Sequence, residues 1–415
     1  MTRPGTFLTG TVLVALIGLL APAPAASQDA NTWSTVKRGL YLTRVGDCEA
    51  CHTVAGQPAY AGNRALPTPF GTIYSANLTP DPDTGIGDWD SDTFFRALDE
   101  GVGKDGKRLY PAFPYTHFTY VTREDSDAIF AYLQSLDPVR NEIREPDLPP
   151  LIGMRTSMRA WNLLNFEEKD FAPDPEKSPQ WNRGRYLVEG LGHCSACHSP
   201  RNLTGAEKRG GARYTGGMAE GWFAPSLRST GPDGIGDWSA EDLKTFLKHG
   251  RNDRTAAFGP MAEVIDKSTR WMTDADISAV VAYLRDLPVE AEDDAERAEG
   301  ERPDDTVMAL GGEIYASQCA ACHGPDGEGV TGMFATLAGS SLVHARNPTT
   351  LIRLVLDGAK AVPTERYPTP FAMPPFHWKL SDAEVAATLS YVRNAFGNSA
   401  GPVTEEAVAD LRGAH

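Results

Sequence analysis

The chain has 415 residues and a formal net charge of −16, with 55 acidic residues against 39 basic ones. This charge argues against binding to nucleic acid, and against adhesion to an anionic membrane through a basic face. It keeps the protein soluble and permits attraction to a partner that carries a basic patch. The length predicts about two to four domains.

The first 27 residues have the pattern of a secretory signal peptide. A basic residue precedes an apolar run from Phe7 to Leu20, and an alanine- and proline-rich stretch offers a cleavage site near Ala25 or Ala26. The run is short for a membrane span, and an uncleaved anchor is the alternative. We therefore expect an exported protein.

The pattern Cys-x-x-Cys-His occurs three times and uses all six cysteines. Two thiols three positions apart lie on one side of a helical turn, where they can form thioethers to the two vinyl groups of one haem. The adjacent histidine can then ligate the iron. A thioredoxin-like motif or a zinc site does not fit, because every copy carries the histidine and no further soft ligand lies near any pair. The sequence therefore predicts three covalent c-type haems, attached at Cys48, Cys51, Cys194, Cys197, Cys319 and Cys322, with His52, His198 and His323 as iron ligands.

The three motifs are embedded in three similar units, in which a helix leads into the motif and another helix closes the unit. We expect an all-α fold of three tandem domains joined by linkers. The units are placed at residues 31–140, 179–288 and 307–398, with linkers at 141–178 and 289–306 and a tail at 399–415. A close crossing of the opening and closing helices is predicted at Gly39, Gly184 and Gly312, opposite Tyr132, Tyr283 and Tyr391.

The two linkers differ in composition. The linker at 289–306 is acidic and almost free of apolar residues, so it is interpreted as a solvated tether. The linker at 141–178 carries an apolar helical stripe, which we expect to cover the neighbouring haem domains. A dock for a partner subunit or the membrane surface is the alternative. The stripe consists of Leu151, Met154, Met158, Trp161 and Leu164.

A c-type haem iron takes a second axial ligand from a later loop, and methionine sulfur there raises the potential. In the third unit Met373 lies in a proline-rich loop just before the closing helix and is the expected ligand. In the second unit we expect Met261, with Met218 and Met272 as alternatives. His193, His249 and His344 are expected at the surface or in contact with haem propionates.

The first unit departs from this pattern, because Phe113 occupies the position that Met373 has in the third unit. Phenylalanine cannot ligate iron, and the unit contains no methionine. We expect His117, in the same loop, to be the sixth ligand and to give a bis-histidine haem of lower potential. The alternatives are an iron without a strong sixth ligand, and ligation by Met154 or Met158 of the linker.

Several phrases of the chain carry a family resemblance. They are Tyr186–Cys194, the Gly-Ile-Gly-Asp-Trp boxes at 85–89 and 234–238, and Phe371–Pro374 followed by Trp378–Asp382. With the three haem motifs, these phrases resemble the tri-haem cytochrome c subunit of periplasmic membrane-associated dehydrogenases, which act on alcohol, gluconate, sorbitol, fructose or aldehydes. The resemblance implies class I cytochrome c domains, with axial roles for Met261 and Met373.

The resemblance also implies a function. The protein is expected to be an electron-transfer subunit and not itself the substrate-oxidising enzyme. It would receive electrons from a catalytic dehydrogenase subunit of the flavin, quinoprotein or molybdenum type, and pass them to ubiquinone or a terminal oxidase. The Phe-Pro-Tyr loop followed by His117 resembles relatives that are paired with molybdenum hydroxylases.

Two other functions are considered. The first is a haem enzyme that acts at the unusual first haem, such as a peroxidase or a thiosulfate dehydrogenase, and the second is a free-standing electron shuttle. Export and covalent haem together predict a periplasmic location in a Gram-negative bacterium, with the protein held at the outer face of the inner membrane.

Overall fold

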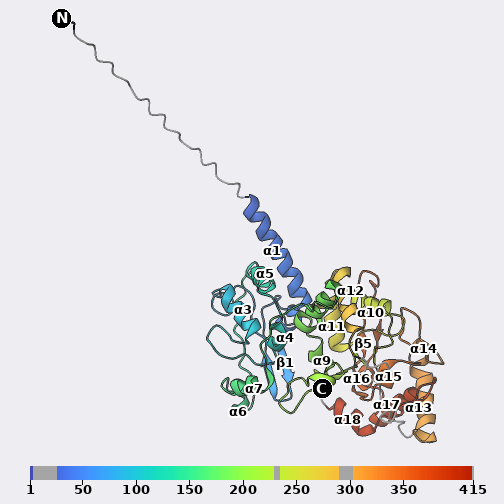
Figure 1. The fold of residues 1–415 in the computed structure, drawn as a ribbon. Helices are drawn as coiled ribbons and strands as arrows, with labels where there is room; N and C mark the ends of the chain where they lie inside the picture. Colours follow the sequence, from blue (N-terminus) through green and yellow to red (C-terminus); the bar gives the residue numbers. More distant parts are fainter. Residues whose placement is uncertain (3–25, 229–233, 289–301, 414–415) are drawn as a thin grey trace.

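The computed structural model describes residues 1–2, 26–228, 234–288 and 302–413. The predicted signal peptide and most of the acidic linker lie outside the described residues. Figure 1 shows three helical units packed together, with the first on the left in blue to cyan and the third at the lower right in orange to red. Within the described part of the chain, no helix has both the length and the apolarity needed to cross a membrane.

The first unit opens with helix α1 and carries its motif on the short helix α2. The loop that follows contains a two-stranded sheet, and the helix α5 closes the unit. Side-chain caps start two of its helices, because Asp90 and Thr122 accept hydrogen bonds from backbone N–H groups of the first turn. The elements are α1 (Ala26–Val45), α2 (Cys48–His52), β1 (Ala65–Thr68), β2 (Gly71–Tyr74), α3 (Ser91–Asp99), α4 (Tyr115–Phe118) and α5 (Arg123–Gln134).

The linker contributes two short helices, α6 (Pro150–Gly153) and α7 (Ser157–Asn165). The second unit repeats the order of the first, with one π-helical turn, η1, between its opening helix and its motif. Its elements are α8 (Pro179–Tyr186), η1 (Leu187–Leu191), α9 (Ser195–His198), η2 (Gly210–Ala212), β3 (Gly217–Ala219), β4 (Trp222–Ala224), α10 (Ala240–His249), α11 (Gly259–Lys267), η3 (Thr269–Trp271) and α12 (Asp274–Leu284).

The third unit has the same frame and ends in an additional helix, α18. Its elements are α13 (Asp305–Gln318), α14 (Ala320–His323), α15 (Ser341–His344), α16 (Thr349–Asp357), β5 (Ala359–Lys360), β6 (Ala372–Met373), α17 (Asp382–Asn394) and α18 (Glu405–Arg412).

The molecule is largely helical, as expected, but each unit also contains a small antiparallel sheet. The pairs are β1 with β2, β3 with β4, and β5 with β6. Their strands have only two to four residues. The expectation of an all-α fold did not include these sheets, since strands of this length give no detectable alternation of apolar residues.

The opening and closing helices cross closely in every unit. A Cβ atom on Gly39 would lie 1.9 Å from the carbonyl oxygen of Ala128, and one on Gly184 would lie 2.0 Å from that of Ala279. Both distances are too short for any side chain, so only glycine allows these helices to approach.

In the third unit the crossing glycine is Gly311. A Cβ there would lie 2.2 Å from the carbonyl oxygen of Ala387, whereas a Cβ on Gly312 would meet only the ring of Tyr391, at 3.2 Å. The prediction of Gly312 was therefore wrong by one residue. The spacing between the crossing and the first cysteine differs among the units, so alignment on the cysteines does not give the helix register.

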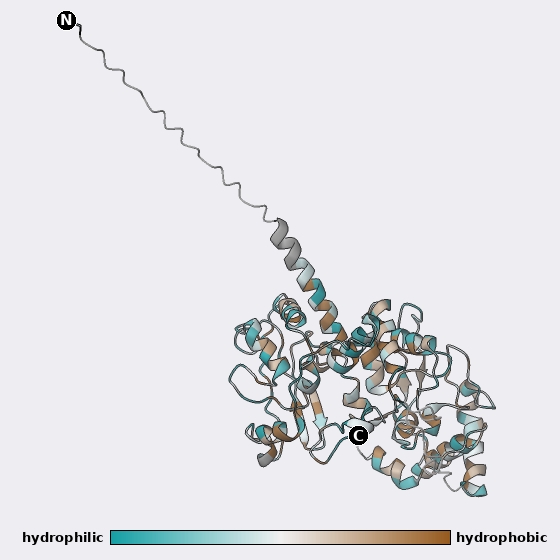
Figure 2. Ribbon diagram, viewed as in Figure 1, coloured by the Kyte–Doolittle hydropathy of each residue, from teal (hydrophilic) through white to brown (hydrophobic). Residues whose placement is uncertain are grey.

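The packed interior is divided unequally among the units. One cluster of buried side chains includes Leu42 and Ile129 of the first unit together with Leu187 and Ile277 of the second. The third unit has a separate cluster. Figure 2 shows α1 becoming apolar where it enters the packed part of the molecule. The first two units therefore share one hydrophobic core.

The apolar stripe of the first linker lies partly inward and partly outward. Met158 is buried, whereas Met154 and Leu164 are exposed. Trp161 is half-buried, with its ring against Tyr115 and its indole N–H donating to the carbonyl of Thr204. The inward part thus covers the first unit and contacts the second.

Candidate haem sites

The three Cys-x-x-Cys-His motifs lie on α2, at the start of α9 and at the start of α14, directly after the opening helix of each unit. All six cysteines are free thiols, and each is half-buried or exposed. None is committed to a disulfide, so each remains available for a thioether bond to a haem.

The proximal histidines share one arrangement. The Nδ1 atom of His52 lies 2.7 Å from the carbonyl oxygen of Ala76, and that of His198 lies 2.8 Å from the carbonyl oxygen of Pro225. The third, His323, has the same contact with Ala335 at 2.9 Å. A ring that donates from Nδ1 keeps the Nε2 lone pair for a metal, so these contacts fix the tautomer that a haem iron needs.

Burial also favours the neutral, metal-binding form of two of these rings. It lowers the pKa of His52 and of His198, although the carbonyl bonded to each ring acts in the opposite direction. A neutral imidazole is the form that binds a metal. In the first two units the carbonyl comes from the residues just after the second strand of the sheet, so this sheet positions the proximal ligand. Sequence reasoning missed these carbonyl groups, because a backbone acceptor leaves no residue pattern.

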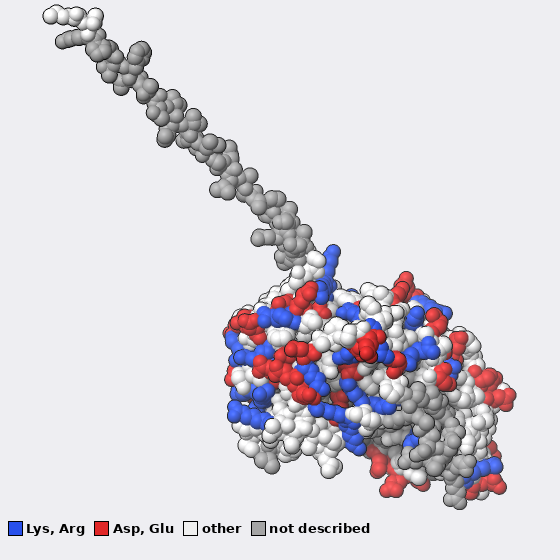
Figure 3. Space-filling model, in the orientation of Figure 1, with Lys and Arg blue, Asp and Glu red and all other residues white. Residues whose placement is uncertain are grey.

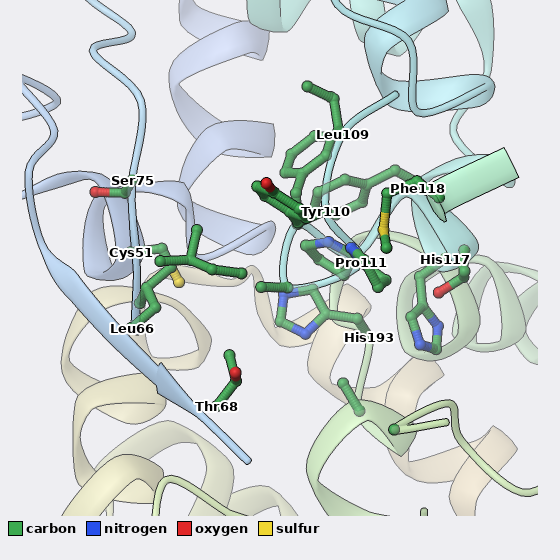
Figure 4. Close-up of a pocket in the computed structure, with 18 of the residues that line it drawn as sticks. Cys51, Leu66, Thr68, Ser75, Leu109, Tyr110, Pro111, His117, Phe118 and His193 are labelled. Atoms are coloured by element: carbon green, nitrogen blue, oxygen red, sulfur yellow. The ribbon is translucent and has the colours of Figure 1, made fainter. Parts of the chain in front are cut away.

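A cavity of about 2120 Å³ surrounds the first motif. Cys48, Cys51 and His52 line it, and so do His193 and Cys197 of the second unit. In Figure 4, Cys51 and Leu66 lie on one side of this cavity and Phe118 and His117 on the other, with the ring of His193 between them. Both attachment cysteines of the first unit and one of the second therefore border one continuous space, which suits a haem at the first motif.

Met261 and Met373 are the expected distal ligands of the second and third units. Met373 belongs to β6, is half-buried and packs against the core of the third unit. Met261 lies in the first turn of α11 and packs against a small cluster that contains Ile265 and Val362.

The two alternatives in the second unit make other contacts. Met218 is 42% exposed, and its sulfur accepts a hydrogen bond from Asn347 Nδ2 at 3.6 Å. Met272 is buried in the core shared by the first two units. Met261 and Met373 stay the expected ligands.

His117 lies between the first two units, where its ring contacts residues of the second unit. Its Nδ1 atom is 3.0 Å from the carbonyl oxygen of Glu189, and its Nε2 atom is 2.7 Å from Glu207 Oε1. Both partners belong to the second unit, and the ring is buried. The Nδ1 contact is like that of the three proximal histidines, but Nε2 is directed at a carboxylate of the second unit. Ligation of the first haem by His117 stays a prediction.

Several buried side chains carry a polar atom without a partner among the described residues, and Asn162 and Arg251 are two of them. Asn162 Nδ2 is buried in the wall of the first unit, and Arg251 Nε is buried between the second and third units. The Arg251 guanidinium lies over the rings of Tyr367 and Phe371. No carboxylate of the described residues pairs with it, and burial lowers its pKa. The Nη1 atom of Arg251 donates to the carbonyl oxygen of Gly332 at 3.2 Å.

Comparison with known proteins gives a consistent result. The sequence model described as cytochrome c matches residues 36–137, 182–288 and 308–396. The chain is 40% identical to the gluconate 2-dehydrogenase cytochrome c subunit of Pantoea cypripedii, over 97% of this chain and 95% of that protein. It is 39% identical to the cytochrome c subunit of the alcohol dehydrogenase (quinone) of Gluconacetobacter polyoxogenes, over 97% and 89%. It is also 34% identical to the fructose dehydrogenase cytochrome subunit of Gluconobacter japonicus, over 94% of this chain and 84% of that protein.

Proposed function

Because the chain belongs to the cytochrome c family, we propose that it is the tri-haem electron-transfer subunit of a periplasmic dehydrogenase complex. The observation that carries the proposal is the threefold proximal arrangement, in which a Cys-x-x-Cys-His motif presents a histidine whose Nδ1 is bound to a backbone carbonyl. The relatives are electron-transfer subunits rather than substrate-oxidising ones.

When bound, each haem supplies one reversible electron step between ferric and ferrous iron. The residues of the chain hold and tune that step. The six cysteines attach the haems, and His52, His198 and His323 act as proximal ligands. Met261 and Met373 supply thioether sulfur to the second and third haems, which raises the potential of those sites.

The shared cavity supports transfer between the first two sites. Cys51 and Cys197 line it from opposite units, so haems attached there would border a common space. Glu220 also lines the cavity. A relay needs such proximity more than it needs a substrate pocket.

The partners are inferred from the relatives and from charge. The donor is a catalytic dehydrogenase subunit of the flavin, quinoprotein or molybdenum type, and the acceptor is ubiquinone or a terminal oxidase. Figure 3 shows acidic and basic side chains intermixed over the visible face of the first unit, as suits a surface that meets several protein partners. The signal-peptide pattern supports a location in the periplasm, with the protein held at the outer face of the inner membrane.

The test is to produce the full chain in a host that matures c-type cytochromes, and to copurify it with a candidate catalytic dehydrogenase subunit from the same organism. We expect three covalent haems by mass, and reduction of all three when the substrate of that dehydrogenase is added. Changing both cysteines of one motif to alanine should remove one haem. Failure of the chain to associate with any dehydrogenase would favour a free-standing shuttle. Peroxide turnover by the isolated chain would favour a haem enzyme.

A further inference from the structure

The linker helix α7 forms part of the wall of the first haem cavity. The Tyr110 hydroxyl donates to the carbonyl oxygen of Gly153 at 2.7 Å, and the Tyr115 hydroxyl donates to Asn162 Oδ1 at 2.6 Å. Both tyrosines belong to the loop that in the third unit carries the ligand methionine. The linker is therefore fixed against the distal side of the first unit.

This packing brings Met158 of the linker into the cavity, which is also lined by the 42% exposed Met218 of the second unit. The Met158 side chain is 6% exposed, and it lines the same cavity as Cys48, Cys51 and His52. Met154, four residues earlier, is 50% exposed. A thioether sulfur is an ordinary axial donor for haem iron.

The residues that would compete with Met158 are less suited. Phe113 has no lone pair, and its ring packs against Phe118 with the ring centroids 5.3 Å apart. The Nε2 atom of His117 lies 2.7 Å from Glu207 Oε1 of the second unit, so this nitrogen is already engaged. His193 also lines the cavity, with its ring 6.3 Å from that of His117. It is the strongest rival, so the experiment must distinguish it from Met158.

A second feature of α7 points to a group beside Met158. Asn162 lies one helical turn after Met158, and its Nδ2 is buried without a partner among the described residues. A buried donor without a partner calls for an acceptor outside the chain, such as an ordered water or a bound group.

We propose that Met158 Sδ is the sixth ligand of the first haem. The proposal rests on the proposed function, in that a haem must be attached at Cys48 and Cys51. All three sites then have histidine–methionine ligation, although the methionine of the first unit comes from a different segment of the chain. His117 instead forms hydrogen-bond contacts with the second unit, which link that unit to the distal loop of the first.

The test uses the full chain with Met158→Leu, which keeps the apolar volume but removes the sulfur, and with Met154→Leu as the matched control. Near-infrared magnetic circular dichroism distinguishes thioether–iron from bis-histidine ligation, and covalent haem content is measured in parallel. We expect three thioether-ligated haems in the unmodified protein. Met158→Leu should keep three haems, lose about one third of the thioether signal and gain carbon monoxide binding at one reduced haem. Met154→Leu should change none of these.

Three outcomes would overturn the proposal. A thioether signal from only two haems in the unmodified protein, with a bis-histidine band, would assign the ligand to a histidine, and His193→Ala or His117→Ala would identify which. An unchanged thioether signal in Met158→Leu would exclude Met158 directly. If that variant fails to fold, the unmodified protein still decides between two and three thioether-ligated haems.

A full set of three haems with the wrong ligation contradicts only this proposal, whereas absence of the haem at Cys48 and Cys51 contradicts the proposed function as well.

Discussion

The first and second units are joined very differently from the second and third. The first junction is reciprocal: the Tyr41 hydroxyl donates to Asp276 at 2.6 Å, and the Tyr186 hydroxyl donates to Asp125 at the same distance. Tyr41 and Tyr186 occupy equivalent positions in the repeated Arg-Gly-x-Tyr-Leu segment. The two units therefore meet as the subunits of an isologous dimer do, with the same surface used twice.

Ion pairs complete each half of this junction. Arg38 Nε donates to Asp125 Oδ1 at 2.8 Å, and Arg183 Nε donates to Asp276 Oδ1 at 2.8 Å. Each aspartate thus binds an arginine of its own unit and a tyrosine of the other. Together with the shared core, these contacts make the first two units one packed body.

The second junction has no such symmetry. The hairpin of the second unit contacts α16, where the Phe223 N–H donates to Thr350 Oγ1 at 3.0 Å and Arg353 Nε donates to the carbonyl of Gly221 at 2.7 Å. The apolar part is a small cluster around Ile265 and Val362. The comparison shows that the first two units form one packed body with a shared core. The third unit has its own core and contacts the second through a small apolar cluster.

The largest effect is expected from the helix crossings. Gly184→Ala and Gly311→Ala would each place a Cβ within about 2 Å of a backbone carbonyl, so each should lower the free energy of unfolding of its unit by about 3 kcal/mol or more. Because of the shared core, Gly184→Ala should also destabilise the first unit, whereas Gly311→Ala should affect only the third. Limited proteolysis with mass spectrometry, combined with thermal unfolding, measures which units are lost.

The matched control for this prediction is Gly312→Ala. Its Cβ would lie 3.2 Å from a tyrosine ring that can move, and alanine favours the helix by about 1 kcal/mol. We expect Gly312→Ala to leave the melting temperature unchanged or slightly raised. Equal damage from Gly311→Ala and Gly312→Ala would contradict the assigned crossing.

The next effect concerns the aspartates of the reciprocal junction. Asp276→Ala leaves the Arg183 guanidinium and the Tyr41 hydroxyl without their acceptor, which should cost about 2–3 kcal/mol in the free energy of unfolding. Asp125→Ala should cost a similar amount, measured by denaturant unfolding. Glu384→Ala, at the corresponding helix start of the third unit, removes only a capping contact and should cost less than about 1 kcal/mol. A large difference in the free energy of unfolding between the two aspartate variants would show that the two halves of the junction are not energetically equivalent.

The same aspartate predicts a pH dependence. Burial acts to raise the pKa of Asp276, but the hydrogen bonds from Arg183 and Tyr41 act against it and the pKa ends below its usual range. A carboxyl with a depressed folded-state pKa stabilises the fold above its unfolded pKa of about 4, and this stability is lost as the pH falls further. The unmodified protein should therefore lose stability on acidification below about pH 4. Asp276→Asn should be less stable at pH 7 and should show a smaller change between pH 7 and pH 3. An identical slope for the two proteins would contradict this role.

The sequence predicted the proximal side of the haem sites because covalent attachment requires a fixed spacing of residues. Met373 was expected as a ligand from its place in a proline-rich loop before a closing helix, and this role stays a prediction. The environment of His117 was not predictable, since its partners Glu189 and Glu207 lie 72 and 90 residues further along the chain. A single histidine in a loop has the same appearance whether it binds iron or a neighbouring unit.

The reciprocal contact between the first and second units could not be predicted for a different reason. The repeated Arg-Gly-x-Tyr-Leu segment was visible as an internal repeat, but a repeat does not say that its copies contact each other. The register of α13 was missed because Gly311 and Gly312 are adjacent, and only the packed helices show which of them meets Ala387. These features depend on the orientation of elements, which local patterns do not encode.

A smaller effect is expected from the tyrosines of the junction. Tyr41→Phe and Tyr186→Phe each remove one hydrogen bond to a charged acceptor and keep the ring, so each should cost about 1–2 kcal/mol in the free energy of unfolding. Tyr391→Phe offers a comparable ring in the third unit without a junction contact, and should cost less. Chemical denaturation of the four proteins compares them. A strong effect of only one junction tyrosine would show that the two halves are energetically unequal.

The smallest effect on stability, but a specific effect on redox behaviour, is expected at the second junction. Arg251 is 4% exposed and lies 3.8 Å over the ring of Tyr367 of the third unit. If a haem propionate binds the unpartnered Nε of Arg251, removing the positive charge destabilises the reduced haem, because reduction adds negative charge to the site. Arg251→Gln should then lower the midpoint potential of one haem and leave the melting temperature nearly unchanged, whereas Arg251→Lys should restore most of the potential. Spectroelectrochemical titration measures both variants against Arg353→Gln, an arginine of the same junction that pairs with Asp357 and with a carbonyl. A shift as large in Arg353→Gln as in Arg251→Gln would mean that the charge of the junction as a whole, and not a bond from Arg251, sets the potential.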